Sequence, residues 1–165
     1  MNSPQKGEGN PNEKKMIALK KALHDRCREF LASQIENLNV ALKAAQDSGN
    51  EETKSTTGDK HETGRAMMQM EQEKIGHQLQ ELLNVRNKLD RISTELSTEK
   101  ILPGNIVITD QGNFYIAIAA GKLVQDGKIY FAISPASPLG ILFLKSAAGE
   151  KVRVNGKEYL IQGSF

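Results

Sequence analysis

The stretch IGHQLQELLNVRNKLDRISTEL, residues 75–96, decides the first part of the fold. Its apolar side chains recur at intervals of seven residues, and a second set occupies the alternate positions between them. The first set is Ile75, Leu82, Leu89 and Leu96, and the second is Leu79, Val85 and Ile92. A repeat of about 3.5 residues is typical of helices that pack along a narrow apolar seam. The sequence therefore predicts a coiled-coil helix from about Glu62 to Ser97.

An earlier segment carries a second helical pattern. Between Glu13 and Gln46 there is no proline or glycine, and apolar residues recur at helical spacing. They form one stripe, which consists of Leu23, Cys27, Phe30, Leu31, Leu38, Leu42 and Ala45. We predict that residues 13–100 fold as an antiparallel coiled-coil hairpin, preceded by a disordered lead-in over residues 1–12. A coiled-coil scaffold that dimerises through residues 75–96 is the alternative interpretation.

The polar break between the two helical patterns is DSGNEETKSTTGDKHETGRA, residues 47–66. It is acidic and contains three glycines and almost no apolar side chain, so it is expected to form a solvated tip with a loop over residues 48–57. Carboxylates are hard oxygen ligands, which suits them to Mg²⁺ that another macromolecule already holds. The tip is therefore a candidate for delivering carboxylates to a partner.

Asp59 and Glu62 are the candidate site residues of the tip, and their spacing supports two interpretations. An Asp at the N-cap followed three residues later by a Glu is a capping box, which stabilises any helix start. The same spacing places both carboxylates on one face of a helix, from which they could reach a single cation. The three histidines, His24, His61 and His77, share no metal-ligand spacing and are expected to be solvated helix residues.

Charge and composition exclude several classes of protein. The chain of 165 residues has 22 Lys and Arg against 20 Asp and Glu, which argues against binding nucleic acid by bulk basic charge. One cysteine, Cys27, excludes an internal disulfide framework and a cysteine-based zinc site, and its place on the apolar stripe indicates a core residue. No apolar run approaches the roughly 20 residues that span a bilayer. We expect a cytoplasmic protein without a membrane partner.

Residues 101–165 follow a different pattern, in which short apolar runs alternate with turn residues. Pro103-Gly104 marks the boundary. Strands are predicted over residues 106–109, 114–119, 129–134, 151–154 and 158–161, with a short helix over residues 139–144. Asn155-Gly156 is a strong signal for a type I′ hairpin turn. The fold class is therefore α+β, with a small antiparallel β-rich domain after the helical hairpin.

The stretch ISPASPLGILFLKSAAGEKVRVNGKEYLIQGSF, residues 133–165, resembles the C-terminal, FKBP-like domain of the Gre transcript-cleavage factors. The matching elements are Ser137-Pro138-Leu139-Gly140, the short helix, Gly149-Glu150-Lys151-Val152 and the closing hairpin. In that family a coiled-coil hairpin precedes this domain, and its tip carries a Gly-Asp-x-x-Glu-Asn motif. This chain has Gly58-Asp59-Lys60-His61-Glu62-Thr63 in the corresponding loop.

The resemblance implies a monomeric transcription elongation factor that binds RNA polymerase and contacts nascent RNA only indirectly. Its coiled coil would enter the secondary channel, where Asp59 and Glu62 would help to hold Mg²⁺ and stimulate cleavage of backtracked RNA. The chain would not be an enzyme by itself, because the polymerase supplies the nuclease site. Ser137, Pro138, Leu139 and Gly140 would bind the polymerase, and replacing Ser137 and Pro138 is expected to leave the melting temperature nearly unchanged.

Departures from the family pattern keep other functions open. Thr63 replaces the Asn of the tip motif, Ala66 stands where the family usually has Tyr, and Ala136 stands where an acidic residue often precedes the Ser. A channel-binding regulator or inhibitor without cleavage activity is the first alternative. An FKBP-like prolyl isomerase or chaperone and a dimeric coiled-coil scaffold are the others.

Overall fold

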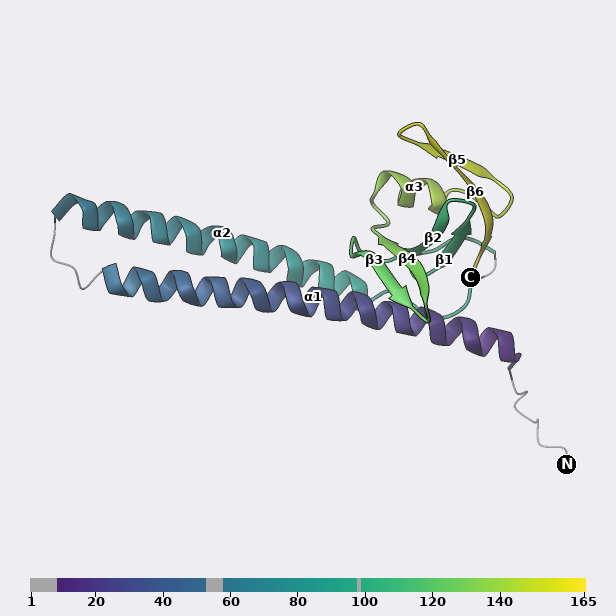
Figure 1. The fold of residues 1–165 in the computed structure, drawn as a ribbon, viewed down its shortest axis with the longest axis horizontal. Coiled ribbons are helices and arrows are strands. Elements are labelled where there is room, and N and C mark those ends of the chain that lie inside the picture. The colour runs from purple at the N-terminus through teal and green to yellow at the C-terminus, as the bar shows by residue number, and fades with distance from the viewer. Residues whose placement is uncertain (1–8, 53–57, 98) are drawn as a thin grey trace, which may run out of the picture. The chain divides into compact units, whose positions relative to one another are not determined.

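The computed structural model describes residues 9–52, 58–97 and 99–165 of the chain. The protein is α+β: a long helix α1 (Pro11–Glu52) and a second helix α2 (Gly58–Asp90) precede a six-stranded mixed sheet (Figure 1). The elements after α2 are β1 (Ile106–Thr109), β2 (Gly112–Ile116), β3 (Gly121–Gln125), β4 (Lys128–Ile133), α3 (Pro138–Leu144), β5 (Lys151–Val154) and β6 (Lys157–Ser164). None of the helices in these described ranges is long and apolar enough to cross a membrane.

The chain divides into two compact units. The sheet unit combines the chain up to Cys27 with Arg91–Phe165, and the helical unit is Arg28–Asp90. The first part of α1 belongs to the sheet unit because two of its buried side chains bond there: Lys20 donates to the carbonyl of Glu95, and His24 is hydrogen-bonded to Tyr115. Sequence periodicity shows that a helix has an apolar stripe, but it does not show which partner covers that stripe.

Within the helical unit, α1 and α2 meet at successive points along their length. The guanidinium of Arg28 lies 3.2 Å from the carboxylate of Asp90, and the side-chain amide of Gln72 donates to the carbonyl of Ala45 over 3.4 Å. Residues with higher numbers in α1 therefore contact residues with lower numbers in α2. Ile75 and Ala45 are buried in the single chain. This order of contacts is compatible with the predicted hairpin, and Figure 1 shows the two helices side by side.

Several predicted helix limits differ from the observed ones. Helix α1 already begins at Pro11, inside the predicted lead-in, and it continues to Glu52, while α2 begins at Gly58. The polar break is therefore largely helical; residues 1–8 of the lead-in and 53–57 of the tip loop lie outside the described residues. At its other end α2 stops at Asp90 instead of Ser97. There Ser93 Oγ accepts the amide of Glu95, a local hydrogen bond that competes with the helix.

The sheet has the order β3-β4-β2-β1-β6-β5, and β2 pairs with β4 in parallel. The prediction of a wholly antiparallel sheet with four or five strands was therefore wrong, and it missed β3 entirely. β3 has only one buried residue, Leu123, so it carries little of the apolar signal that marks a strand. The predicted hairpin at Asn155-Gly156 is confirmed, because both residues have positive φ and β5 pairs with β6 across them.

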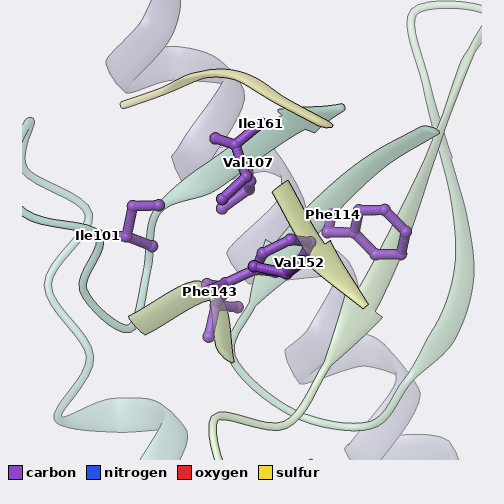
Figure 2. Close-up of a cluster of buried hydrophobic side chains, with 7 residues drawn as sticks. Ile101, Val107, Phe114, Phe143, Val152 and Ile161 are labelled. Atoms are coloured by element: carbon purple, nitrogen blue, oxygen red, sulfur yellow. The ribbon is translucent and has the colours of Figure 1, made fainter. Parts of the chain in front are cut away.

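The two faces of the sheet pack against different helices within the sheet unit. On one face, Phe143 of α3 packs against Phe114 of β2, with ring centroids 5.5 Å apart. These rings belong to a buried cluster with Ile101, Val107, Ile116, Val152 and Ile161, most of which Figure 2 labels. Tyr115, which follows Phe114 and therefore points to the opposite face, is hydrogen-bonded to His24 of α1. The sheet thus lies between α3 and the first part of α1.

Candidate functional site

The predicted polymerase-binding turn is a closed network of local hydrogen bonds between β4 and α3. The hydroxyl of Ser137 donates to the carbonyl of Ser134 over 2.7 Å and accepts the amide of Gly140 over 3.1 Å. The hydroxyl of Ser134 accepts the amide of Ala136 over 3.1 Å. Ser137 is therefore the N-cap of α3, and Pro138 occupies the first helical position, where its missing N–H is not needed. The sequence prediction did not include Ser134, although it completes the turn.

Gly140 is required in this turn because the backbone passes very close to it. A Cβ at Gly140 would lie 2.2 Å from the carbonyl oxygen of Ser134 and 2.9 Å from Ser137 Oγ. Ser137 is half-buried and bonded in both directions, so replacing it removes a helix cap at a cost of about 0.5–2 kcal/mol. The expectation that Ser137 could be replaced with almost no loss of stability was therefore wrong. Pro138 is exposed and does not carry this cost.

The surface next to the turn is apolar. Val124 of β3 and Ile129 and Phe131 of β4 are 49%, 45% and 38% exposed, and we call these three residues the β3–β4 strip. Val124 is directly opposite Ile129 in the ladder, and Phe131 lies beside Phe114, so the strip lies on the face of the sheet that α3 covers elsewhere. β4 runs directly into the Ser134–Gly140 turn. A preorganised turn and an exposed apolar strip therefore follow one another along the chain.

The two candidate acids lie in the first turn and a half of α2. Because α2 begins at Gly58, Asp59 lies within the helix rather than at the N-cap position that the sequence predicted, and Glu62 follows one turn later. Glu62 is exposed, while the side chain of Asp59 lies outside the described residues. Among the residues described, no three carboxylate, histidine or cysteine side chains gather so that they could hold a metal ion. Glu62 therefore belongs to no metal-binding cluster among the described side chains.

No family model, curated protein or solved structure matches this chain. The likeness to the Gre factors accordingly rests on the residues of the chain itself, chiefly on the Ser-Pro-Leu-Gly turn and the Gly-Asp-x-x-Glu stretch. The structure adds an α+β architecture in which a helical region precedes a small mixed sheet. That architecture is compatible with the likeness and does not by itself identify a function.

Helix α1 contains the buried side chains of Lys20, His24 and Cys27, of which only Cys27 was predicted from the sequence to be buried. The ammonium of Lys20 donates to the carbonyl of Glu95, and burial lowers the pKa of Lys20. His24 was expected to be solvated, but it is buried and bonded to Tyr115. Cys27 is confirmed as a core residue, and burial raises the pKa of its thiol to about 12, so it is no nucleophile at neutral pH. The signal for this cluster was the spacing of residues 20, 24 and 27 on one helix face.

A polar groove between α1 and α2 was also missed. It has a volume of about 500 Å³, and side-chain amides and the guanidinium of Arg65 line it. Of the neighbouring methionines in α2, Met67 and Met70 are 61% and 69% exposed. Only Met68 contributes to the groove. Polar side chains at helix–helix contacts give no periodic apolar signal, so sequence reasoning had no means of finding this site.

Proposed function

We propose that the chain is a monomeric cytoplasmic factor of Gre type, which binds RNA polymerase through its sheet unit and presents an acidic helical tip to the secondary channel. The observation that carries the proposal is the Ser134–Gly140 turn. Its hydroxyls bond within the turn, and the exposed side chains are apolar: Ala136 and Pro138 in the turn and Ile141 directly after it. A rigid apolar projection loses little conformational entropy on binding, which favours a protein partner.

The β3–β4 strip supports the same partner. Single exposed apolar residues are common, but three neighbouring ones on one sheet face indicate an interaction surface. Because β4 continues into the turn, a partner that covers Pro138 is in reach of Phe131 as well. Lys122 is directly opposite Phe131 and adds a positive charge at this border. The partner surface is therefore expected to be apolar with acidic residues at its edge.

The helical unit would deliver Asp59 and Glu62, as an antiparallel hairpin whose apolar residues are covered within one chain. Ile75 and Ala45 are already buried in the monomer, which favours this interpretation over a dimeric scaffold. In the complex, the two carboxylates would provide oxygen ligands for Mg²⁺ that the polymerase holds and would orient the water that attacks the RNA. The isolated chain would be inactive. The FKBP-like isomerase is less well supported, because Phe114 and Phe143 pack together in the core.

Transcript cleavage in backtracked elongation complexes, assembled with the polymerase of the same organism, tests this proposal. The Asp59→Asn variant should lose stimulated cleavage while retaining polymerase binding, because it removes the negative charge that Mg²⁺ needs and keeps the size of the side chain. Asp47→Asn is the matched control, because Asp47 is an exposed acid of the same tip in α1. Failure of the wild-type chain to bind polymerase would contradict the proposal.

A regulator that occupies the channel without cleavage is the second candidate, and Thr63 and Ala66 favour it. Both stand where the Gre pattern has other residues, next to the acidic pair. If the wild-type chain binds polymerase and stimulates no cleavage, it should instead compete with a cleavage-active factor in the same complexes. The Thr63→Asn and Ala66→Tyr substitutions together should then increase cleavage.

A further inference from the structure

The groove between α1 and α2 has features of a ligand-binding site that neither the acidic tip nor the docking turn explains. Its polar lining consists of Gln46 and Asn50 from α1 and Arg65, Gln69 and Gln72 from α2, with Met68 as the apolar part. The volume of about 500 Å³ lies within the range of roughly 300–1,000 Å³ that is typical of small-molecule sites. All of these residues belong to the helical unit.

The helices are held close together at one side of this groove. The amide of Gln72 donates to the carbonyl of Ala45 over 3.4 Å and so ties α2 to the backbone of α1. Gly49 faces Gln72 and Met68, and a Cβ built on Gly49 would lie 3.5 Å from Gln72 Nε2 and 3.7 Å from Met68 Cβ. Because Gly49 has no side chain, the groove stays open above these two residues. The backbone around it is helical on both sides and therefore preorganised.

The charge of the groove selects an anion. Among the residues that the structure describes, Arg65 is the only charged one that lines the groove, and none of their carboxylates is paired with it. A guanidinium binds phosphate through two parallel hydrogen bonds. Gln69 donates to the carboxylate of Glu73 over 3.5 Å and Gln72 to the carbonyl of Ala45 over 3.4 Å, so each of these carboxamides keeps one N–H and an oxygen that accepts. A donor beside an acceptor is the pattern that pairs with the edge of a nucleobase. The thioether of Met68 suits contact with an aromatic heterocycle.

We propose that this groove binds a mononucleotide, with its phosphate on Arg65 and its base against the carboxamides of Gln46 and Gln69. A free phosphate or a small carboxylate would engage Arg65 and leave the carboxamides without a ligand partner. A neutral nucleoside would leave the guanidinium without one. The proposal is independent of polymerase binding, because the groove is complete within the helical unit of the free chain.

Isothermal titration of the full chain with adenosine monophosphate tests the proposal, with adenosine and inorganic phosphate titrated separately. Binding of the nucleotide should be saturable, and both fragments should bind at least about tenfold more weakly, because each lacks one set of hydrogen bonds. Arg65→Ala should weaken nucleotide binding by about tenfold or more, since it removes a charge-assisted contact. Gln69→Ala should weaken nucleotide binding and leave phosphate binding unchanged.

Arg86→Ala is the matched control, because Arg86 is an exposed arginine of α2 that does not line the groove. Helix content from circular dichroism checks that each variant folds, and Arg65→Lys provides a variant that keeps the charge and loses the two-point contact. The proposal is overturned if the nucleotide does not bind at millimolar concentration. It is also overturned if inorganic phosphate binds as tightly as the nucleotide, or if Arg86→Ala weakens binding as much as Arg65→Ala.

Discussion

His24 Nδ1 lies 2.9 Å from the phenol oxygen of Tyr115, and both side chains are buried. This hydrogen bond joins α1 to β2 across 91 residues of sequence. Near it, the ammonium of Lys20 bonds to the carbonyl of Glu95, and the guanidinium of Arg26 reaches the side chain of Gln125 over 3.4 Å. The first part of α1 is therefore a structural part of the sheet unit, not a free arm that precedes it.

Replacing Tyr115 with Phe should destabilise the sheet unit by about 1–3 kcal/mol, because it leaves a buried ring nitrogen of His24 without its partner. Urea denaturation followed by circular dichroism measures this loss. Tyr159→Phe is the matched control: Tyr159 packs its ring against Phe114 and Phe143 and keeps that contact in the variant. Equal urea midpoints for the two variants would show that the hydrogen bond adds no stability.

Gly140→Ala should lower the free energy of unfolding by about 1–3 kcal/mol, the usual cost of forcing an atom into a filled space. The added Cβ would meet the carbonyl oxygen of Ser134 at 2.2 Å, so the turn and the start of α3 must shift. Gly163→Ala is the control, since a Cβ there meets nothing within 4 Å. Denaturant midpoints of the two variants give the comparison, and a Gly140→Ala variant as stable as Gly163→Ala would contradict the steric argument.

Pro138→Glu should weaken polymerase binding while the melting temperature changes little. Pro138 is exposed at the first position of α3, where a Glu is compatible with the helix dipole, but a buried charge at an apolar interface is costly. Ala148→Glu introduces the same charge at an exposed turn after α3 and should bind normally. Pull-down with immobilised polymerase measures both variants. Normal binding of Pro138→Glu would exclude the turn from the interface.

Cys27 should resist thiol reagents in the folded chain and react quickly once the chain unfolds. Its pKa is raised from 9.0 to about 12, so at pH 8 the thiolate is about a thousandfold scarcer than in an ordinary thiol, and the side chain is also buried. Labelling with and without urea measures the difference. A variant with its cysteine moved to exposed position 32 (Cys27→Ala with Ala32→Cys) should react at once without urea. Fast labelling of native Cys27 would show that α1 leaves the sheet unit readily.

The raised pKa of Cys27 also sets a sign for the effect of alkaline pH on stability. Between about pH 9 and 12 the unfolded chain loses the thiol proton while the folded chain keeps it, so this group makes the free energy of unfolding fall as pH rises. Below pH 9 the thiol is protonated in both states and contributes no pH dependence. Cys27→Ala removes this contribution, while the raised pKa values of Tyr130 and Lys151 still lower the free energy of unfolding as pH rises.

Lys20 should make the free energy of unfolding change with pH in the opposite direction. Burial lowers its pKa below 10.5, so in the interval up to 10.5 the unfolded chain binds more protons and stability rises with pH. In the Cys27→Ala background, Lys20→Met should make the urea midpoint fall more, or rise less, as pH approaches 10.5, because it removes this contribution. The same pH dependence of the urea midpoint with and without Lys20→Met would show that Lys20 does not contribute.

Sequence periodicity predicted the existence of both helices, because a helix that is buried on only one face already shows apolar residues at helical spacing. Strands over residues 106–109 and 151–154 and the Asn155-Gly156 turn were also predicted correctly, since turn residues with positive φ restrict the local backbone strongly. The Ser-Pro-Leu-Gly turn was visible as a motif because Ser favours the N-cap and Pro the first position of a helix. Its hydrogen bonds to Ser134 were not, because they depend on how β4 enters the turn.

The sequence by itself thus determined the local structure of this protein: two long helices, a series of short strands, and a proline-glycine turn that starts the last helix. Only the tertiary structure decided that β2 pairs in parallel with β4 and that Lys20 and His24 are buried. The groove around Arg65 is also a feature that only the tertiary structure decided. These features depend on contacts between residues far apart in the chain, whose free energies local propensity does not contain.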